Sequence, residues 1–145
     1  MMGGSTMQEV LLHGGPDESF DSSVVLAHRL ADTFGARLHV VYTIADPLSA
    51  GWTAEMSAER LPEVHQAMEG EARERLSRLI SVEDQERLGV TIALRTGPAT
   101  EELVRYTTEH SIDLAIVQSR SDSDPGAEIA RALLADGQCA VLVLR

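Results

Sequence analysis

The segment 112–144 constrains the fold of this chain more than any other stretch. It contains two apolar runs rich in β-branched residues, 112–117 and 139–144, separated by a polar loop and a short helical repeat. Parallel neighbouring strands need a crossover of about a dozen residues or more, which a helix usually supplies. The segment therefore predicts a β-α-β unit. Its polar loop leaves the carboxyl end of the first strand, where open parallel sheets bind their ligands.

The rest of the chain alternates in the same way. Apolar runs predict strands at 8–12, 37–44 and 90–95, and helical repeats predict helices at 20–34, 64–79 and 98–110. The stretch 46–62 contains Pro47, Gly51 and Pro62 and is expected to be a long irregular connection. Right-handed crossovers then predict an α/β fold, a doubly wound five-stranded parallel sheet with helices on both faces.

One domain at 8–145 is expected to follow a flexible leader at 1–7. This leader lacks the basic start and apolar core of a signal peptide. No apolar run approaches the roughly 20 residues that cross a bilayer. We therefore expect a cytoplasmic protein that does not engage a membrane.

The charged residues exclude several kinds of partner. The formal net charge is −11, and all twelve basic residues are arginines. Nucleic acids and anionic membranes are recognised through clustered basic side chains, and the sequence has no such cluster. The absence of lysine also removes a P-loop or Schiff-base lysine. The five histidines show no metal-ligand spacing with the lone Cys139, so no metal is expected.

The polar loop at 118–124 is the strongest candidate ligand site. It offers hydrogen-bonding groups and one cation: Gln118, Ser119, Arg120 and Ser121. Asp124 and Pro125 are expected to cap and begin the last helix. The same residue types satisfy turns and helix starts without any ligand, so a solvated connector is an equal alternative.

A second candidate follows the first strand, at Gly14, Gly15 and Asp17. Glycine lets backbone amides approach a phosphate closely, although a tight strand-to-helix turn explains the pair equally simply. The run faintly resembles the S-G-G-x-D-S loop of ATP pyrophosphatases, with His13 in place of the first serine. That resemblance implies an enzyme acting between Gly14 and Ser19, which the small size and the absence of lysine disfavour.

From Val10 to Arg145 the chain resembles the universal stress protein family. The similarity is clearest in four stretches: LADTFGARLHVV at 30–41, TGPATEEL at 96–103, SIDLAIV at 111–117 and CAVLVLR at 139–145. Their order and spacing are more specific than any one of them. The resemblance implies the strand order 3-2-1-4-5, a homodimer, and a role in stress tolerance rather than catalysis.

Members of that family that bind ATP carry an aspartate after the first strand and a G-x2-G-x9-G-[ST] pattern after the fourth. The corresponding positions here are Gly14 or Gly15, then Gln118 and Ser121, then Ala127 and Glu128. Losing these glycines removes the close backbone approach that cradles phosphates, and Glu128 would repel a triphosphate. The resemblance is therefore closest to the branch that does not bind ATP.

Three functions follow from these observations. The favoured one is a non-catalytic binding or signalling module without a cofactor, whose partner is a small molecule or a regulatory protein. The second is an ATP or AMP binder that uses Gly14, Gly15, Ser119 and Ser121. The third is the pyrophosphatase-type enzyme. Thr43, at the end of the second strand, is expected to help line any small-ligand site.

The last strand is the expected dimer interface. In the order 3-2-1-4-5 it lies at the edge of the sheet, and no charge or proline protects it from pairing with another strand. The residues concerned are Ala140, Val141, Leu142, Val143 and Leu144. We expect two copies of this strand to pair in an antiparallel manner across a two-fold axis.

Overall fold

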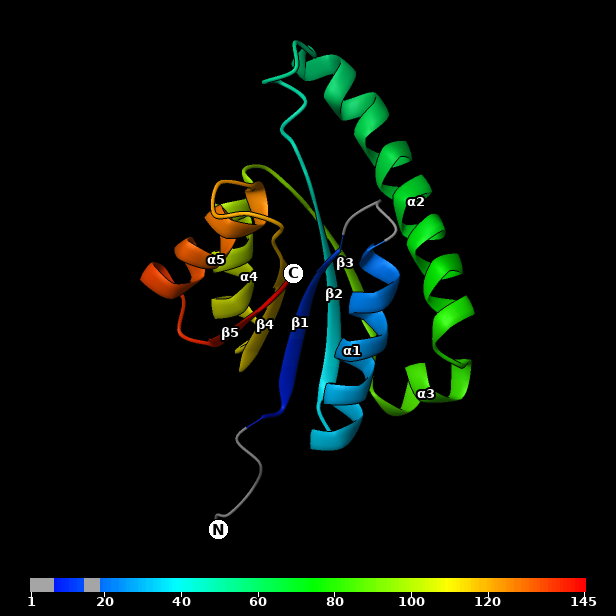
Figure 1. Cartoon of the computed structure of the whole chain (residues 1–145). Coiled ribbons are helices and arrows are strands. Elements are labelled where there is room, and N and C mark those ends of the chain that lie inside the picture. Colours follow the sequence, from blue (N-terminus) through cyan, green and yellow to red (C-terminus); the bar gives the residue numbers. More distant parts are fainter. Residues whose placement is uncertain (1–6, 15–18) are drawn as a thin grey trace.

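The computed structural model describes residues 7–14 and 19–145, which form a sheet covered by helices (Figure 1). Its elements are β1 (Glu9–Gly14), α1 (Ser19–Phe34), β2 (Arg37–Ile44), α2 (Ala54–Leu79), α3 (Val82–Arg87), β3 (Thr91–Thr96), α4 (Ala99–Glu109), β4 (Leu114–Gln118), α5 (Pro125–Asp136) and β5 (Ala140–Leu144). All neighbouring strands are parallel, in the order β3-β2-β1-β4-β5. The predicted fold class and strand order are confirmed.

Two apolar cores lie on opposite faces of the sheet. Val10 and Leu12 of β1 pack with residues of α1 and α2, whereas Leu11 packs with residues of α4 and α5. Figure 1 shows the two helix pairs on either side of the strands. Because both faces are covered, the central strands are apolar on both faces, which explains their nearly continuous apolar sequences.

The carboxyl ends of all five strands meet at one edge of the sheet. β1 lies at the centre, with β2 on one side and β4 on the other, so the strand order reverses next to β1. The loop after β2 and the first half of α2 extend beyond this edge (Figure 1). The loops at this edge surround the place where doubly wound sheets bind ligands.

The predicted irregular connection at 46–62 is wrong in its second half. α2 begins at Ala54, where Thr53 caps it by accepting a 3.1 Å hydrogen bond from the amide of Met56. Pro62 lies inside this helix and cannot donate to the carbonyl of Ala58. Because both residues are exposed, water can satisfy that carbonyl, and the helix continues past the proline.

The part of the chain that the structure describes contains no helix of the length and apolar character that crossing a membrane requires. The expected leader at 1–7 lies outside the described residues except for Met7, and Gly15 and Asp17 lie outside them entirely.

Candidate functional site

Asp124 organises the loop between β4 and α5. Its Oδ1 accepts hydrogen bonds from the amide of Ala127 at 2.9 Å and lies 2.8 Å from the hydroxyl of Ser119. Its Oδ2 accepts a 2.6 Å bond from the amide of Arg120. The same carboxylate caps α5, as the sequence predicts. The donors of the loop are therefore bonded to a carboxylate of the protein itself, that of Asp124.

Three donors stabilise the charged form of this carboxylate. The amides of Arg120 and Ala127 and the hydroxyl of Ser119 lower the pKa of Asp124 to about 2. The group is therefore ionised at neutral pH. The first turn of α5, where the helix dipole favours an anion, already has its negative charge. A phosphate at this position would have to displace Asp124 or accept its repulsion.

Gly126 explains how closely α5 approaches β4. A Cβ added to Gly126 would lie 1.7 Å from the carbonyl oxygen of Gln118 and 3.2 Å from the Cα of Ser119. Only glycine fits there. Gly126 is therefore required for the close packing of α5 against the end of β4. The neighbouring Ala127 is also buried.

The remaining predicted residues of this loop have different surroundings. Ser119 is buried, and its amide donates to the carbonyl of Leu144 at the end of β5. Ser121 supplies a carbonyl 2.8 Å from the Ser119 hydroxyl. The side chains of Arg120 and Glu128 are exposed. The hydroxyl of Ser119, the carbonyl of Ser121, the carboxylate of Asp124 and the amide of Arg120 are therefore bonded to one another.

Gly14, the last residue of β1, is required by packing. A Cβ on it would lie 2.8 Å from the Cζ atom of Tyr42, whose ring packs against the backbone at this point. Burial raises the pKa of Tyr42 to about 12. This contact accounts for Gly14 without a phosphate. The partners proposed beside it, Gly15 and Asp17, lie outside the described residues.

Thr43 lies at the carboxyl edge, as expected, and pairs with a histidine. Its Oγ1 lies 3.0 Å from Nε2 of His13. Burial lowers the pKa of His13 to about 4, so the imidazole is neutral near pH 7. The pair offers a ligand hydrogen-bonding groups without charge.

A hollow of about 350 Å³ opens beside Thr43, between the loop after β2 and the start of α4. Its other walls include Asp46, Ser49 and the residues 97–99. Within the described part of the chain, Asp46 is the only charged residue that lines it. The hollow therefore suits a small ligand that is uncharged or positively charged. A polyphosphate would find no cation in these walls.

Sequence reasoning missed most of this hollow. Asp46 and Ser49 were expected only as parts of an irregular connection, and the residues 97–99 only as the start of a helix. A signal for them exists in retrospect, because both segments follow neighbouring strands and so lie at the same edge. Among the described residues, no group of three or more histidine, cysteine or acidic side chains is placed to hold a metal ion.

Comparison with known proteins agrees with this fold. The model of the universal stress protein family matches residues 10–145. Similar solved structures include UspA from Lactobacillus plantarum (15% identity, 95% of this chain and 97% of that chain, TM-score 0.66) and a family member from Burkholderia pseudomallei (22%, 97% and 98%, 0.62). A third is a universal stress protein in complex with cAMP (17%, 95% and 96%, 0.62). No curated relative matches the chain. The family match covers nearly the whole chain, and the chain therefore belongs to the universal stress protein family.

Proposed function

We propose that this protein is a non-catalytic binding or signalling module of the stress response that works without ATP. The observation that supports this most directly is the position of Asp124. Its carboxylate occupies the amino end of α5 and takes the amides of Arg120 and Ala127. In a protein that binds phosphates at this loop, such donors would be free for the ligand.

Charge supports the same proposal. The chain has a formal net charge of −11, so a triphosphate approaches against a negative field. Glu128 is exposed in the first turn of α5 and adds to this field. Arg120 is the one cation within the loop 118–124, and it is exposed to water. We infer that no nucleotide triphosphate is held here at cellular concentrations.

The partner we propose is a small uncharged or cationic ligand in the hollow beside Thr43, or a regulatory protein that binds to the carboxyl edge of the sheet. The relative solved in complex with cAMP supports a small-molecule ligand for this family member too. The strongest alternative ligand is a nucleotide with a single negative charge. The hydroxyls of Thr43 and Ser49 and the carboxylate of Asp46 would bond its sugar better than its phosphate.

Calorimetric titration tests the proposal. ATP, AMP and cAMP are titrated separately into the purified protein, with and without Mg²⁺, after mass spectrometry for nucleotide retained from expression. The relative known with cAMP serves as a positive control in the same buffer. We expect no heat from ATP up to 1 mM, which is roughly the Kd that corresponds to −4 kcal/mol. Micromolar ATP binding, or retained ATP, would overturn the proposal and establish a nucleotide binder.

We further propose that two copies associate through β5. This strand ends the sheet, and in the described residues its one strand partner is β4. Ala140 and Val143 are exposed, and the other three residues of β5 are only half-buried. An apolar edge of this kind is a template for another strand. Sedimentation velocity at micromolar concentration should show a dimer, and a monomer throughout would refute this arrangement.

A further inference from the structure

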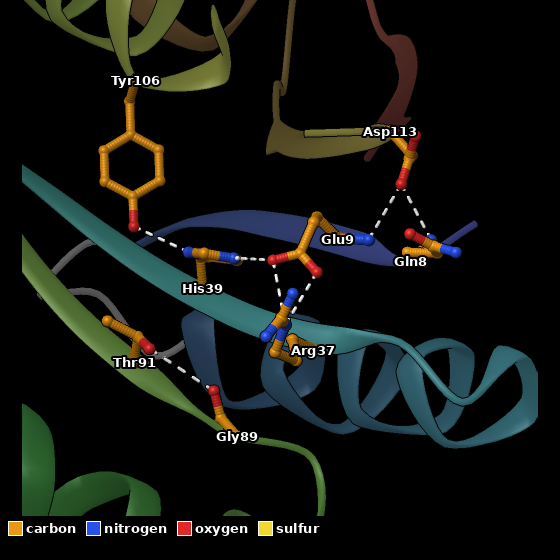
Figure 2. A network of polar contacts seen from close by, with 8 residues as sticks. All are labelled: Gln8, Glu9, Arg37, His39, Gly89, Thr91, Tyr106 and Asp113. Atoms are coloured by element: carbon orange, nitrogen blue, oxygen red, sulfur yellow. Dashed lines mark hydrogen bonds and ion pairs between the residues drawn. The ribbon is translucent and has the colours of Figure 1, made fainter. Parts of the chain in front are cut away.

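A chain of hydrogen bonds crosses from α4 to the sheet near the amino ends of the strands, opposite the loops described above (Figure 2). The hydroxyl of Tyr106 lies 2.7 Å from Nδ1 of His39. Nε2 of His39 lies 3.1 Å from Oε1 of Glu9, and Oε2 of Glu9 accepts a 2.8 Å bond from Nε of Arg37. Three elements, α4, β2 and β1, are thus joined through one buried imidazole.

The chemistry of the partners fixes the direction of these bonds. An ionised carboxylate only accepts, so Nε2 of His39 must hold a proton for Glu9. Nδ1 of the neutral ring is then an acceptor, and the hydroxyl of Tyr106 donates to it. A second proton on His39 would face that hydroxyl hydrogen. The hydroxyl would have to turn away, and its hydrogen would lose a partner in a place where Tyr106 is 1% exposed.

The surroundings of His39 disfavour a positive charge. On β2, Arg37 is cationic, and at the C-cap of α4 the ring of His110 lies 5.6 Å from that of His39. On β3, the guanidinium of Arg95 lies 4.9 Å from the ring centre of Tyr106. On β1, Glu9 is the carboxylate that bonds to His39.

Two further acidic groups lie near this chain of hydrogen bonds but bond to other residues. Glu109 on α4 pairs with Arg95 at 2.7 Å. Asp113, which precedes β4, accepts from the amides of Gln8 and Glu9 through its Oδ2. Burial, outweighing Glu9, lowers the pKa of His39 below its ordinary value. The folded protein therefore prefers the neutral ring.

We propose that His39 is an acid-sensitive latch that fastens α4 to the sheet when neutral and releases α4 when protonated. Tyr106 is among the largest fully buried side chains of the described residues, and it attaches the C-terminal half of α4 to β2. Protonation reverses the bond, so that Nδ1 donates to the hydroxyl oxygen and the hydroxyl hydrogen loses its acceptor. It also places an imidazolium beside Arg37 and His110. The side of α4 that contains Leu103 and Tyr106 is then held less firmly against the sheet. This inference stands independently of any ligand at the opposite edge.

Hydrogen exchange followed by mass spectrometry tests the latch. Peptides covering α4 are compared between pH 7.5 and 5.5 after correction for the intrinsic exchange rate. We expect their protection to fall, by at most about tenfold, because the open form takes up its proton at the ordinary pKa of 6.5. His39→Gln is the decisive variant, because its amide oxygen can accept from Tyr106 and its amide nitrogen can donate to Glu9 without titrating. His28→Gln, on α1, is the matched control and should keep the wild-type response.

Two variants that keep His39 provide a second test. Glu9→Gln removes the carboxylate that bonds to His39, so the NMR titration midpoint of the His39 ring should move to lower pH. Arg37→Gln removes a repulsive charge from a side chain that is 68% exposed, so the midpoint should move to higher pH. Unchanged α4 protection in the wild type, a response that survives in His39→Gln, or shifts that do not oppose each other would overturn the proposal. If His39→Gln does not fold, the proposal is tested by the other two results: the opposite shifts of the His39 midpoint in the two charge variants, and the pH dependence of α4 protection in the wild type.

Discussion

The Cα of Gly126 lies so close to the carbonyl of Gln118 that an added Cβ would be 1.7 Å from the oxygen. Gly126→Ala therefore forces α5 away from β4. We expect a loss of about 3 kcal/mol or more in the free energy of unfolding, measured with urea. Gly70→Ala is the control, since Gly70 is exposed in α2 with open space around it. It should stabilise by about 0.5–1 kcal/mol. Equal effects of the two changes would contradict the packing argument.

Asp124→Ala should destabilise the protein at neutral pH, because it removes the cap of α5 and leaves the amides of Arg120 and Ala127 without an acceptor. The pKa of Asp124 is lowered to about 2, so its contribution is complete above 3.8 and disappears as pH falls toward 2. The difference in thermal midpoint between the two proteins should therefore shrink below pH 3.8. Ser123→Ala, an exposed neighbour, serves as the control. A difference that does not depend on pH would mean that the charge is unimportant.

His13 should make the protein less stable in mild acid. Its pKa falls from 6.5 to about 4 on folding, so the unfolded chain takes up the proton first. Stability is then unaffected above pH 6.5 and declines as the pH falls from 6.5 toward 4. His13→Gln should remove about 2 kcal/mol of the wild-type loss between pH 7.5 and 4.5, measured by urea unfolding at both pH values. If both proteins lose the same free energy of unfolding between the two pH values, folding does not lower the pKa of His13.

Val143→Pro should abolish the proposed dimer without unfolding the monomer. The amide of Ala140 donates to Asp113, toward β4, so alternation directs the amides of Val141 and Val143 outward. Proline at 143 removes one outward donor and no bond to β4. Val143→Thr keeps that donor and is the matched control. Sedimentation should give a monomer for the first variant and a dimer for the second; a dimer in both would place the interface elsewhere.

Local signals were sufficient for much of the fold. The β-α-β unit at 112–144 and the cap formed by Asp124 and Pro125 were predictable, because periodicity and capping are properties of neighbouring residues. The start of α2 was not, since Pro62 normally marks a helix boundary and only its exposure shows that it does not. Strong local rules fail where solvent compensates for a lost bond.

The sites were less predictable than the fold. The loop after β4 was found from its polar residues, but the three-donor cage around Asp124 depends on how the loop closes. The bonds of His39 join residues separated by 67 positions (Tyr106) and 30 positions (Glu9) in the chain, so no local pattern contains them. A partial signal was present, because His39 lies in an apolar strand in phase with Val41, which faces α4.

The strand order also determines how the chain can fold during synthesis. β1 is made first and lies in the centre, between β2 and β4. One of its edges stays without a partner strand until Leu114 and the residues after it have emerged, because these pair with Val10 to Leu12. A chain truncated before β4 would keep that backbone edge open to neighbouring nascent chains. The part of the polypeptide from Leu114 onward is thus what protects the first strand from aggregation.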